Sequence, residues 1–315
     1  MKTFIKAFVS LGLIGILLYN VEWDALLENL GSLSIWTVIT VLLIFTAQFP
    51  ISAQKWRTAL RIHQLDYSFN YLLKVLSIGF FFNNFLPSSI GGDAYRVIKT
   101  VPQEGYKSRA VSAVLLERII GFGALLFLGF IGGLISLQYE QNRLVQMYVL
   151  ICAAGGGAAI VLYVLLRAGF FAALLDRIKH VKKLEILTHN LGHIWRNPGM
   201  IINVSLVSLL FQVLAVLAIS ILFDALDTEG TYAKYAVMAA IVGLAGVLPI
   251  SINGIGVIEG AFVVSATQLG IGYNEAIIVA FMLRILVLPL SLVCGVVYLL
   301  DSNRQDKTGG EVIKD

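Results

Sequence analysis

Apolar residues fill long segments of the chain, and short polar stretches separate them. A helix needs about 20 apolar residues to cross the hydrocarbon core of a bilayer. Six segments meet or approach that length: residues 4–20, 33–54, 111–137, 145–166, 201–222 and 276–300. The pattern predicts an all-α polytopic membrane protein whose six segments are full transmembrane helices.

Two further apolar stretches are interrupted by residues that break helices. Residues 71–90 end in the motif FFNNFLPSSIGGDAYR (81–96), and residues 235–270 contain LPISINGIG (248–256). Broken helices occur at membrane depth only inside protein or beside a water-filled cavity. We therefore expect two re-entrant broken-helix hairpins, the first of which returns by residue 100.

The basic residues favour this topology, because cytoplasmic loops of membrane proteins carry an excess of Lys and Arg. If the first hairpin enters from the cytoplasm, cytoplasmic loops hold 18 of the 23 Lys and Arg, among them Lys55. Outer loops hold only Arg143 and Lys234, whereas a full crossing would reverse every later loop. We expect a multi-pass protein of the cell (inner) membrane with cytoplasmic termini and a polar cytoplasmic tail at 301–315.

The composition agrees with a membrane protein. Hydrophobic residues make up 58% of the chain and charged residues 13%, against about 25% charged residues in soluble domains. The net charge of +4 is small and the basic residues lie in short loops, which argues against nucleic-acid binding. Lys2 and Lys6 precede the apolar core of the first segment, as in a signal peptide, but no small-x-small cleavage site follows, so we expect an uncleaved helix.

Two sequence motifs recur along the chain. LPSSIGG at 86–92 matches LPISING at 248–254 at an offset of 162. AVSAVLLERII at 110–120 aligns with AIIVAFMLRIL at 276–286 at an offset of 166. Both hairpin tips and both following helices therefore have a counterpart in the other half of the chain.

The second alignment places Arg118 opposite Arg284. With hairpins that enter from opposite sides, it predicts an inverted repeat of residues 1–137 and 145–300. Inverted repeats are a common plan for transporters with a central site. Chance recurrence of Leu-Pro and Ser-x-Gly in a Gly-rich membrane sequence stays the alternative.

Ionisable residues inside the predicted membrane segments are the main candidates for function. Glu117 and Arg118 lie about two turns inside the predicted crossing helix 111–137, and Glu259 and Arg284 lie in the second half. Charges at membrane depth face protein, water or a polar ligand. Internal ion pairs of Arg118 with Asp93 and of Arg284 with Glu259 are one explanation, and binding of a lipid phosphate is another. Glu117 or Glu259 is also a candidate proton-coupling group.

The hairpin tips offer backbone amides at half-helix N-termini, which favour anions. Asp93 is expected to cap a helix beginning at Ala94 and thus to weaken this field. We predict that an anionic headgroup binds between the two hairpins. The candidate substrate-binding residues are Asn83, Asn84, Ser88, Ser89, Gly91, Gly92, Asp93, Arg96, Glu117, Arg118, Asn253, Gly254, Glu259 and Arg284.

The sequence contains no recognisable constellation for hydrolase or transferase chemistry. We therefore do not expect an enzyme, and neither a cofactor nor a metal site is expected. Cys152 and Cys294 both fall in apolar segments, which predicts free buried thiols.

Three motifs carry a resemblance to a known family. NNFLPSSIGGDAYRV, AVLLERIIG and LPISINGIGVIEGAF resemble the transmembrane region of lysylphosphatidylglycerol synthase, a flippase-like family that includes stand-alone, UPF0104-type members. In full-length synthases this region is similar to a lipid flippase, and a separate domain attaches the amino acid to phosphatidylglycerol. Because the chain ends at residue 315, soon after its last predicted helix, the synthase domain is expected to be absent.

The resemblance implies lipid translocation without aminoacylation. The expected partner is a membrane lipid with an anionic headgroup, either a phospholipid or a lipid-linked precursor such as a polyprenyl or glycolipid. A non-transporting scaffold or accessory subunit of a lipid- or glycan-modifying enzyme is the alternative, and a small-solute transporter is a third. A protein partner or a homo-oligomer stays open, and no nucleic acid is expected.

Overall fold

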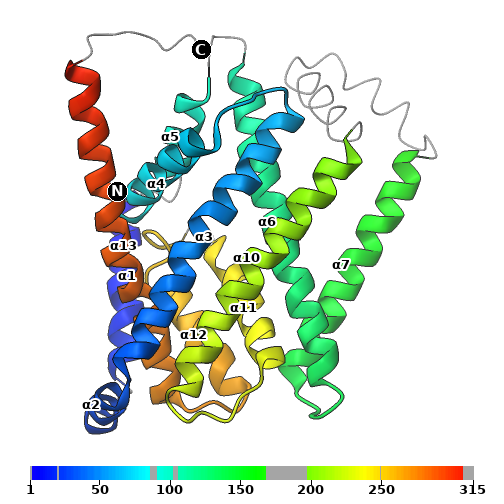
Figure 1. The fold of residues 1–315 in the computed structure, drawn as a ribbon. Helices are drawn as coiled ribbons and strands as arrows, with labels where there is room; N and C mark the ends of the chain where they lie inside the picture. Colours follow the sequence, from blue (N-terminus) through cyan, green and yellow to red (C-terminus); the bar gives the residue numbers. More distant parts are fainter. Residues whose placement is uncertain are drawn as a thin grey trace.

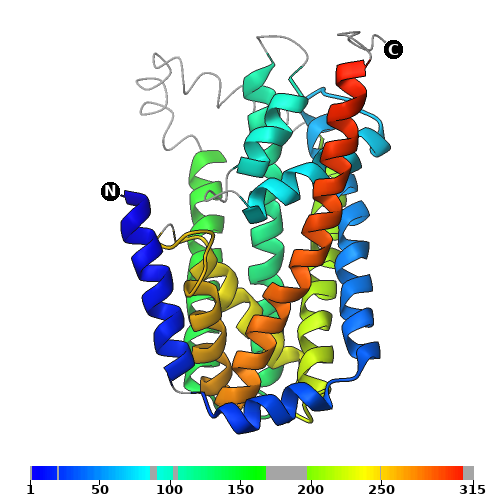
Figure 2. The same cartoon turned by 90° about the vertical axis from the view of Figure 1, so that its left-hand side faces the viewer.

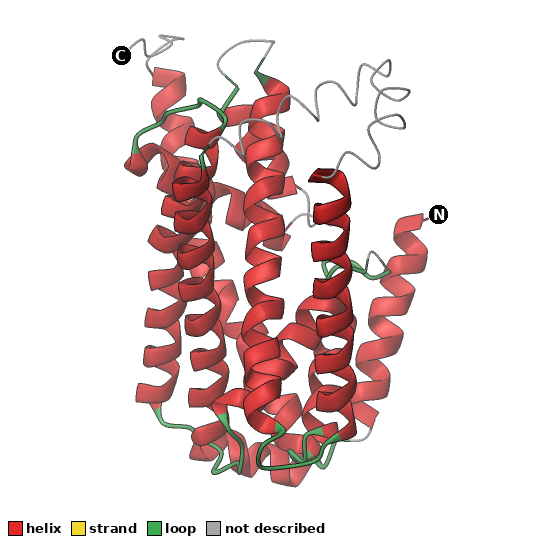
Figure 3. Cartoon of the chain, turned by 90° about the vertical axis from the view of Figure 1, so that its right-hand side faces the viewer, coloured by secondary structure: helices red, strands yellow, loops and turns green. Residues whose placement is uncertain are grey.

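The computed structural model describes residues 2–19, 21–85, 91–101, 106–167, 197–248 and 250–307. These residues form eleven helices, with no strand among them (Figures 1 and 3). The helices are α1 (Lys2–Tyr19), α2 (Trp23–Ser32), α3 (Ile35–Ile62), α4 (Phe69–Phe85), α5 (Gly91–Lys99), α6 (Lys107–Ser136), α7 (Arg143–Arg167), α10 (Pro198–Asp224), α11 (Tyr232–Gly246), α12 (Val257–Gln268) and α13 (Tyr273–Lys307).

The all-α polytopic fold is confirmed in the described residues. Five helices are long and apolar enough to cross a membrane, namely α3, α6, α7, α10 and α13. The sixth predicted crossing segment, 4–20, corresponds to α1, whose apolar part Phe8–Tyr19 is shorter. Many of the large apolar side chains on the bundle exterior are exposed, as expected where lipid is the solvent.

The first hairpin consists of α4 and α5, and both of its ends lie at one end of the bundle. The hydroxyl of Tyr71, near the start of α4, donates a hydrogen bond to the carbonyl of Lys99 at the end of α5, at 2.7 Å. This is the upper end of Figure 1, where α3 and α13 finish. The chain therefore enters and leaves the bundle at the upper end, as predicted.

The second hairpin consists of α11 and α12 and belongs to the opposite, lower end of the bundle. The ammonium of Lys234, at the start of α11, lies 2.9 Å from the carboxylate of Glu140. The side-chain amide of Asn142 donates to the carbonyl of Gln268, the last residue of α12, at 2.7 Å. Both ends of this hairpin thus contact the loop that follows α6, and the two hairpins point into the bundle from opposite ends (Figure 2).

Each half of the chain therefore contains crossing helices, a hairpin and a long final helix, and the two hairpins have opposite directions. This is the arrangement that an inverted repeat requires. The division into repeat halves at 1–137 and 145–300 stays a prediction.

Three segments differ from the prediction. Helix α3 continues to Ile62, so Lys55 is a buried helical residue and does not lie in a cytoplasmic loop. Helix α13 continues to Lys307, so the expected tail at 301–315 is helical for its first seven residues, and residues 308–315 lie outside the described residues. The stretch between the predicted crossing segments 4–20 and 33–54, for which no helix was predicted, contains the helix α2, which lies across the lower end of the bundle (Figure 2).

Apolar packing holds each hairpin against the crossing helices. In the second half, Phe223 at the end of α10 stacks on Tyr235 with ring centroids 4.9 Å apart, and it also stacks on Phe262 of α12. In the first half, Trp56 and Leu60 of α3 are fully buried together with Leu72 and Val75 of α4. Both hairpins are therefore part of the protein core.

Candidate functional site

A cavity of about 660 Å³ lies between the second hairpin and helices α10 and α13, and the first hairpin reaches it with the end of α4. Most of its wall is aliphatic and aromatic. Five side chains supply its polar groups: Asn84, Gln212, Asn253, Glu259 and Arg284. An apolar cavity of this size with a few convergent polar groups is typical of a ligand site.

Arg284 and Glu259 form an ion pair at the wall of the cavity. The Nε of Arg284 donates to Oε1 of Glu259. The other carboxylate oxygen accepts a hydrogen bond from the backbone amide of Gly256 at 2.7 Å, which closes the first turn of α12. Both oxygens of Glu259 are therefore occupied, and its side chain is only 2% exposed.

The terminal nitrogens of Arg284 are the chemically available groups of this pair. Within the described part of the chain, Nε is the only Arg284 nitrogen that has a hydrogen-bond partner. The Arg284 side chain is 29% exposed and lines the cavity. A guanidinium binds carboxylate or phosphate with two parallel N–H donors, so Arg284 can hold Glu259 and still present donors to an anion.

The backbone at the tip of the second hairpin is unusual in three places. Asn253, Gly254 and Gly256 have positive φ angles of 51°, 73° and 83°. A Cβ on Gly254 would also collide with the side chain of Ile258. The tip therefore depends on glycine for its shape, and this shape brings Asn253 to the cavity.

A second set of charged residues lies at the first hairpin, and we call it the buried charge cluster. It consists of Lys55, Asp93, Arg96 and Glu117, whose side chains are largely buried, together with Arg118, whose side chain is 52% exposed. Glu117 contacts Arg96 and lies 3.3 Å from the ammonium of Lys55. Asp93 contacts Arg118 and lies 3.3 Å from Arg96. Three cations meet two carboxylates, which leaves one positive charge in excess.

The buried charge cluster ties three elements together. Lys55 comes from α3, Arg96 from α5 and Glu117 from α6, and all three are buried. The guanidinium of Arg96 also lies over the ring of Trp56, with 4.2 Å from its central carbon to the ring centroid. The cluster thus fixes the first hairpin against the crossing helices.

The family described as "Lysylphosphatidylglycerol synthase TM region" matches residues 3–295. The chain belongs to this family. It is also similar to a UPF0104 membrane protein of Pyrococcus horikoshii, with 26% identity over 123 residues. That alignment covers 38% of this chain and 37% of the relative, so the chain matches little more than a third of the relative's length.

In this member of the lysylphosphatidylglycerol synthase transmembrane family, the predicted site residues separate into distinct groups. Four of them line the cavity: Asn84, Asn253, Glu259 and Arg284. Four belong to the buried charge cluster: Asp93, Arg96, Glu117 and Arg118. The sequence therefore identified two charged centres, one at each hairpin, and grouped them as one site.

The remaining predicted residues shape the hairpins. The side-chain oxygen of Asn83 accepts a hydrogen bond from the amide of Gly92 at 2.8 Å, which joins α4 to α5 across the first tip. Gly91 begins α5, and Gly254 forms the turn at the second tip. Ser88 and Ser89 lie outside the described residues.

One prediction about the first hairpin is wrong. Asp93 does not cap a helix that begins at Ala94, because α5 already begins at Gly91. The Asp93 carboxylate instead binds Arg96 and Arg118. Two guanidinium groups are stronger partners for a carboxylate than backbone amides in the first turn of a helix.

The two predicted ion pairs are both present in this family member. Arg118 contacts Asp93, and Arg284 contacts Glu259. The partners are 25 residues apart in each pair, and each residue of the first pair lies 166 positions before its counterpart in the second. The offset is the same one that aligns the helices α6 and α13.

Two residues of the site were missed by sequence reasoning. Gln212 lines the cavity and donates from its amide to the carbonyl of Gly121 at 3.1 Å. Lys55 binds Glu117 in the buried charge cluster. The available signal for Gln212 was an isolated polar residue in the apolar run 201–222, and for Lys55 it was continued helical periodicity beyond residue 54.

Cys152 and Cys294 are free thiols, as predicted, although Cys152 is only partly buried. Among the described residues, no group of three or more His, Cys, Asp or Glu side chains is placed to hold a metal ion.

Proposed function

We propose that this protein moves a lipid with an anionic headgroup between the leaflets of the cell (inner) membrane. The observation that carries the proposal is the cavity at the junction of the two hairpins, with the terminal nitrogens of Arg284 available at its wall. A lipid headgroup meets a high free-energy barrier in a hydrocarbon core, because polar groups lose their hydration there. A cavity that presents polar groups at membrane depth lowers that barrier.

Each polar residue of the cavity has a role in this proposal. Arg284 binds the headgroup phosphate or carboxylate through its terminal nitrogens, for which its planar donor geometry is suited. Asn84, Gln212 and Asn253 offer neutral hydrogen bonds that hold a headgroup without trapping it. Glu259 compensates the charge of Arg284 when the cavity holds no anion. It is also the candidate proton-coupling group, since its protonation would release Arg284 to an anion.

The inverted repeat supplies the route in this proposal. Transporters of this plan expose a central site to one side and then to the other as one repeat moves against its partner. The positive-inside rule assigns the upper end of the bundle to the cytoplasm, with both termini on that side. The protein acts as a transporter and not as an enzyme in this proposal, and the partner is the lipid itself.

The repeat also explains why the cavity belongs to the second half. At the offset of 166, Arg96 and Glu117 of the first half correspond to Phe262 and Leu283. Phe262 and Leu283 both line the cavity, whereas Arg96 and Glu117 close on each other. At these two positions the first half contains a buried ion pair, whereas the second half contains two apolar residues that line the cavity.

Reconstitution in vesicles tests the proposal. Fluorescent phosphatidic acid is placed in both leaflets, and a membrane-impermeant reductant reports the fraction that reaches the outer leaflet. We expect the protein to accelerate exchange of phosphatidic acid, and the double variant Arg284→Gln/Glu259→Gln to lose this activity. Arg61→Gln, which breaks the exposed pair with Asp66 outside the cavity, is the matched control and retains it.

Two results would overturn the proposal. One is an exchange rate for the wild-type protein equal to that of protein-free vesicles. The other is unchanged exchange in the folded double variant. Native mass spectrometry then separates the alternatives, since a retained anionic lipid supports a transporter and a retained protein subunit supports the scaffold role.

A further inference from the structure

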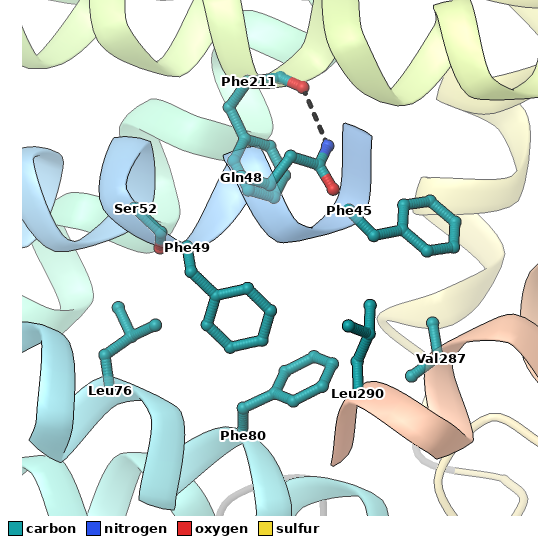
Figure 4. A pocket seen from close by; sticks show the side chains of 9 residues that line it. All are labelled: Phe45, Gln48, Phe49, Ser52, Leu76, Phe80, Phe211, Val287 and Leu290. Carbon is teal, nitrogen blue, oxygen red and sulfur yellow. Dashed lines mark hydrogen bonds between the residues drawn. The ribbon is translucent and has the colours of Figure 1, made fainter. Parts of the chain in front are cut away.

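A second, smaller pocket of about 170 Å³ lies beside the cavity, between helices α3, α4, α10 and α13 (Figure 4). Phe49 of α3 and Phe80 of α4 meet across it edge to face, with ring centroids 4.9 Å apart. Gln48 and Ser52 are the only polar residues among those that line it. The side-chain amide of Gln48 donates to the carbonyl of Phe211 at 3.1 Å, which uses one of its two N–H groups (Figure 4).

The pocket adjoins the cavity that holds Arg284. Val287 lines both spaces and lies one turn beyond Arg284 on α13. On α4, Phe80 lines the pocket and Asn84, one turn later, lines the cavity. On α10, Phe211 lines the pocket and the next residue, Gln212, lines the cavity. Each of these three helices therefore lines the pocket and, within a single turn, places a polar side chain at the cavity.

We propose that this pocket binds one linear acyl chain of the phospholipid whose headgroup lies at Arg284. The inference rests on the proposed function and adds the apolar part of the substrate to it. A charged compartment that adjoins an apolar one is complementary to an amphiphile, and the surrounding lipid supplies such molecules. The second acyl chain stays outside the protein.

The size of the pocket limits what it can hold. A cavity of roughly 150 Å³ lined by apolar side chains stays dry and binds a molecule the size of benzene. The pocket therefore has room for a short stretch of a single hydrocarbon chain. A polyprenyl chain is wider than a linear acyl chain because it carries methyl branches, so we expect the pocket to select against it.

Photo-crosslinking tests the proposal directly. The purified full chain is mixed with phosphatidic acid that carries a diazirine in one acyl chain, irradiated, and analysed by peptide mass spectrometry. We expect label on Phe45, Phe49, Leu76 and Phe80. Labelling should fall when unlabelled phosphatidic acid competes, and a polyprenyl phosphate should compete poorly.

Two variants on α13 make the test specific. Leu290→Trp fills the pocket and should abolish the label there, since Leu290 is part of its wall. Leu292→Trp adds the same side chain two residues later, at a position that is 57% exposed, and should leave the label unchanged. If Leu290→Trp fails to fold, as judged by its melting temperature and gel filtration, Ser52→Leu fills the pocket from α3 with a smaller change.

The outcomes distinguish this inference from the proposed function. Label only on the exposed apolar surface, label in the pocket that survives Leu290→Trp or Ser52→Leu, or equal competition by polyprenyl phosphate would overturn the acyl-chain site. Lipid exchange that depends on Arg284 would then still support the transporter. Specific pocket label in a protein that exchanges no lipid would keep the acyl-chain site and refute the transporter.

Discussion

The guanidinium of Arg284 binds the carboxylate of Glu259 and so joins α13 to the second hairpin. The carboxylate also accepts from the Gly256 amide, and its side chain is almost fully buried. A charge that is buried in protein at membrane depth is tolerated only when it is paired. The pair is therefore part of the structure of the hairpin as well as part of the wall of the cavity.

Loss of the cation alone should destabilise the protein. Arg284→Gln leaves the Glu259 carboxylate buried without a counter-charge, and breaking a buried pair in this way costs about 3–5 kcal/mol. We expect the free energy of unfolding to fall by about 3 kcal/mol, the lower end of that range. The Arg284 side chain is 29% exposed, so water can relieve part of the penalty. Denaturant unfolding in mixed micelles measures it.

Two controls separate this charge effect from lost packing. The double variant Arg284→Gln/Glu259→Gln removes both charges and should recover most of the lost stability. Arg61→Gln breaks the exposed pair with Asp66 and should change stability by less than about 1 kcal/mol. A double variant as unstable as Arg284→Gln would show that the buried charge is not the cause.

The buried charge cluster should respond asymmetrically to substitution. Glu117→Gln leaves Lys55 and Arg96 close together and buried without their shared carboxylate, which should cost about 3–5 kcal/mol. Lys55→Met leaves Glu117 paired with Arg96 and should cost clearly less. Thermal melts of the two variants in one detergent compare them, and a larger loss for Lys55→Met would contradict the central role of Glu117.

The arrangement of the helices could be predicted from local information. Apolar length identified the crossing helices, and the placement of Lys and Arg identified the first hairpin as re-entrant. Helix α2 was missed because its ten residues mix apolar and acidic side chains and read as a polar loop. Helix ends were less accurate, since charged residues such as Lys55 and Asp301 continue α3 and α13 when an ion-pair partner on another helix is available.

The site could be predicted only in part. Ionisable residues in apolar segments indicated both ion pairs, because a charge at such a position requires a partner. Gln212 has no partner near it in sequence, and its place in the cavity depends on how α10 faces the second hairpin. The separation of the charged residues into a cavity and a locked cluster likewise depends on Phe262 and Leu283, which carry no chemical signal.

Cysteine labelling tests the direction of the first hairpin. In a background of Cys152→Ala and Cys294→Ala, we introduce Asp66→Cys before α4 and Lys107→Cys after α5, both at exposed positions. A membrane-impermeant thiol reagent should reach both from the same side of the membrane, because the hairpin returns to the end at which it entered.

The second hairpin provides the matched comparison. Asp227→Cys precedes α11 and Gln268→Cys ends α12, and both positions are exposed at the lower end. Both should be labelled from the side opposite to Asp66→Cys. Labelling of Asp66→Cys and Lys107→Cys from opposite sides would mean that the first hairpin crosses the membrane and that the proposed cavity is not formed by two opposed tips.

Gly92 should be far more sensitive to substitution than glycines on the lipid-facing helix α7. A Cβ on Gly92 would collide with the carbonyl of Gly79 on α4 and would lie 2.7 Å from the side chain of Asn83. Gly92→Ala should therefore force α4 and α5 apart and cost about 1–3 kcal/mol. A Cβ on Gly155 has no neighbour within 4 Å, so Gly155→Ala should be neutral or should stabilise α7 by about 0.5–1 kcal/mol.

Melting temperatures of the two variants give the comparison. Equal tolerance at both positions would mean that α4 and α5 do not pack at van der Waals contact, and the hydrogen bond from the Gly92 amide to Asn83 would then not hold the first tip closed.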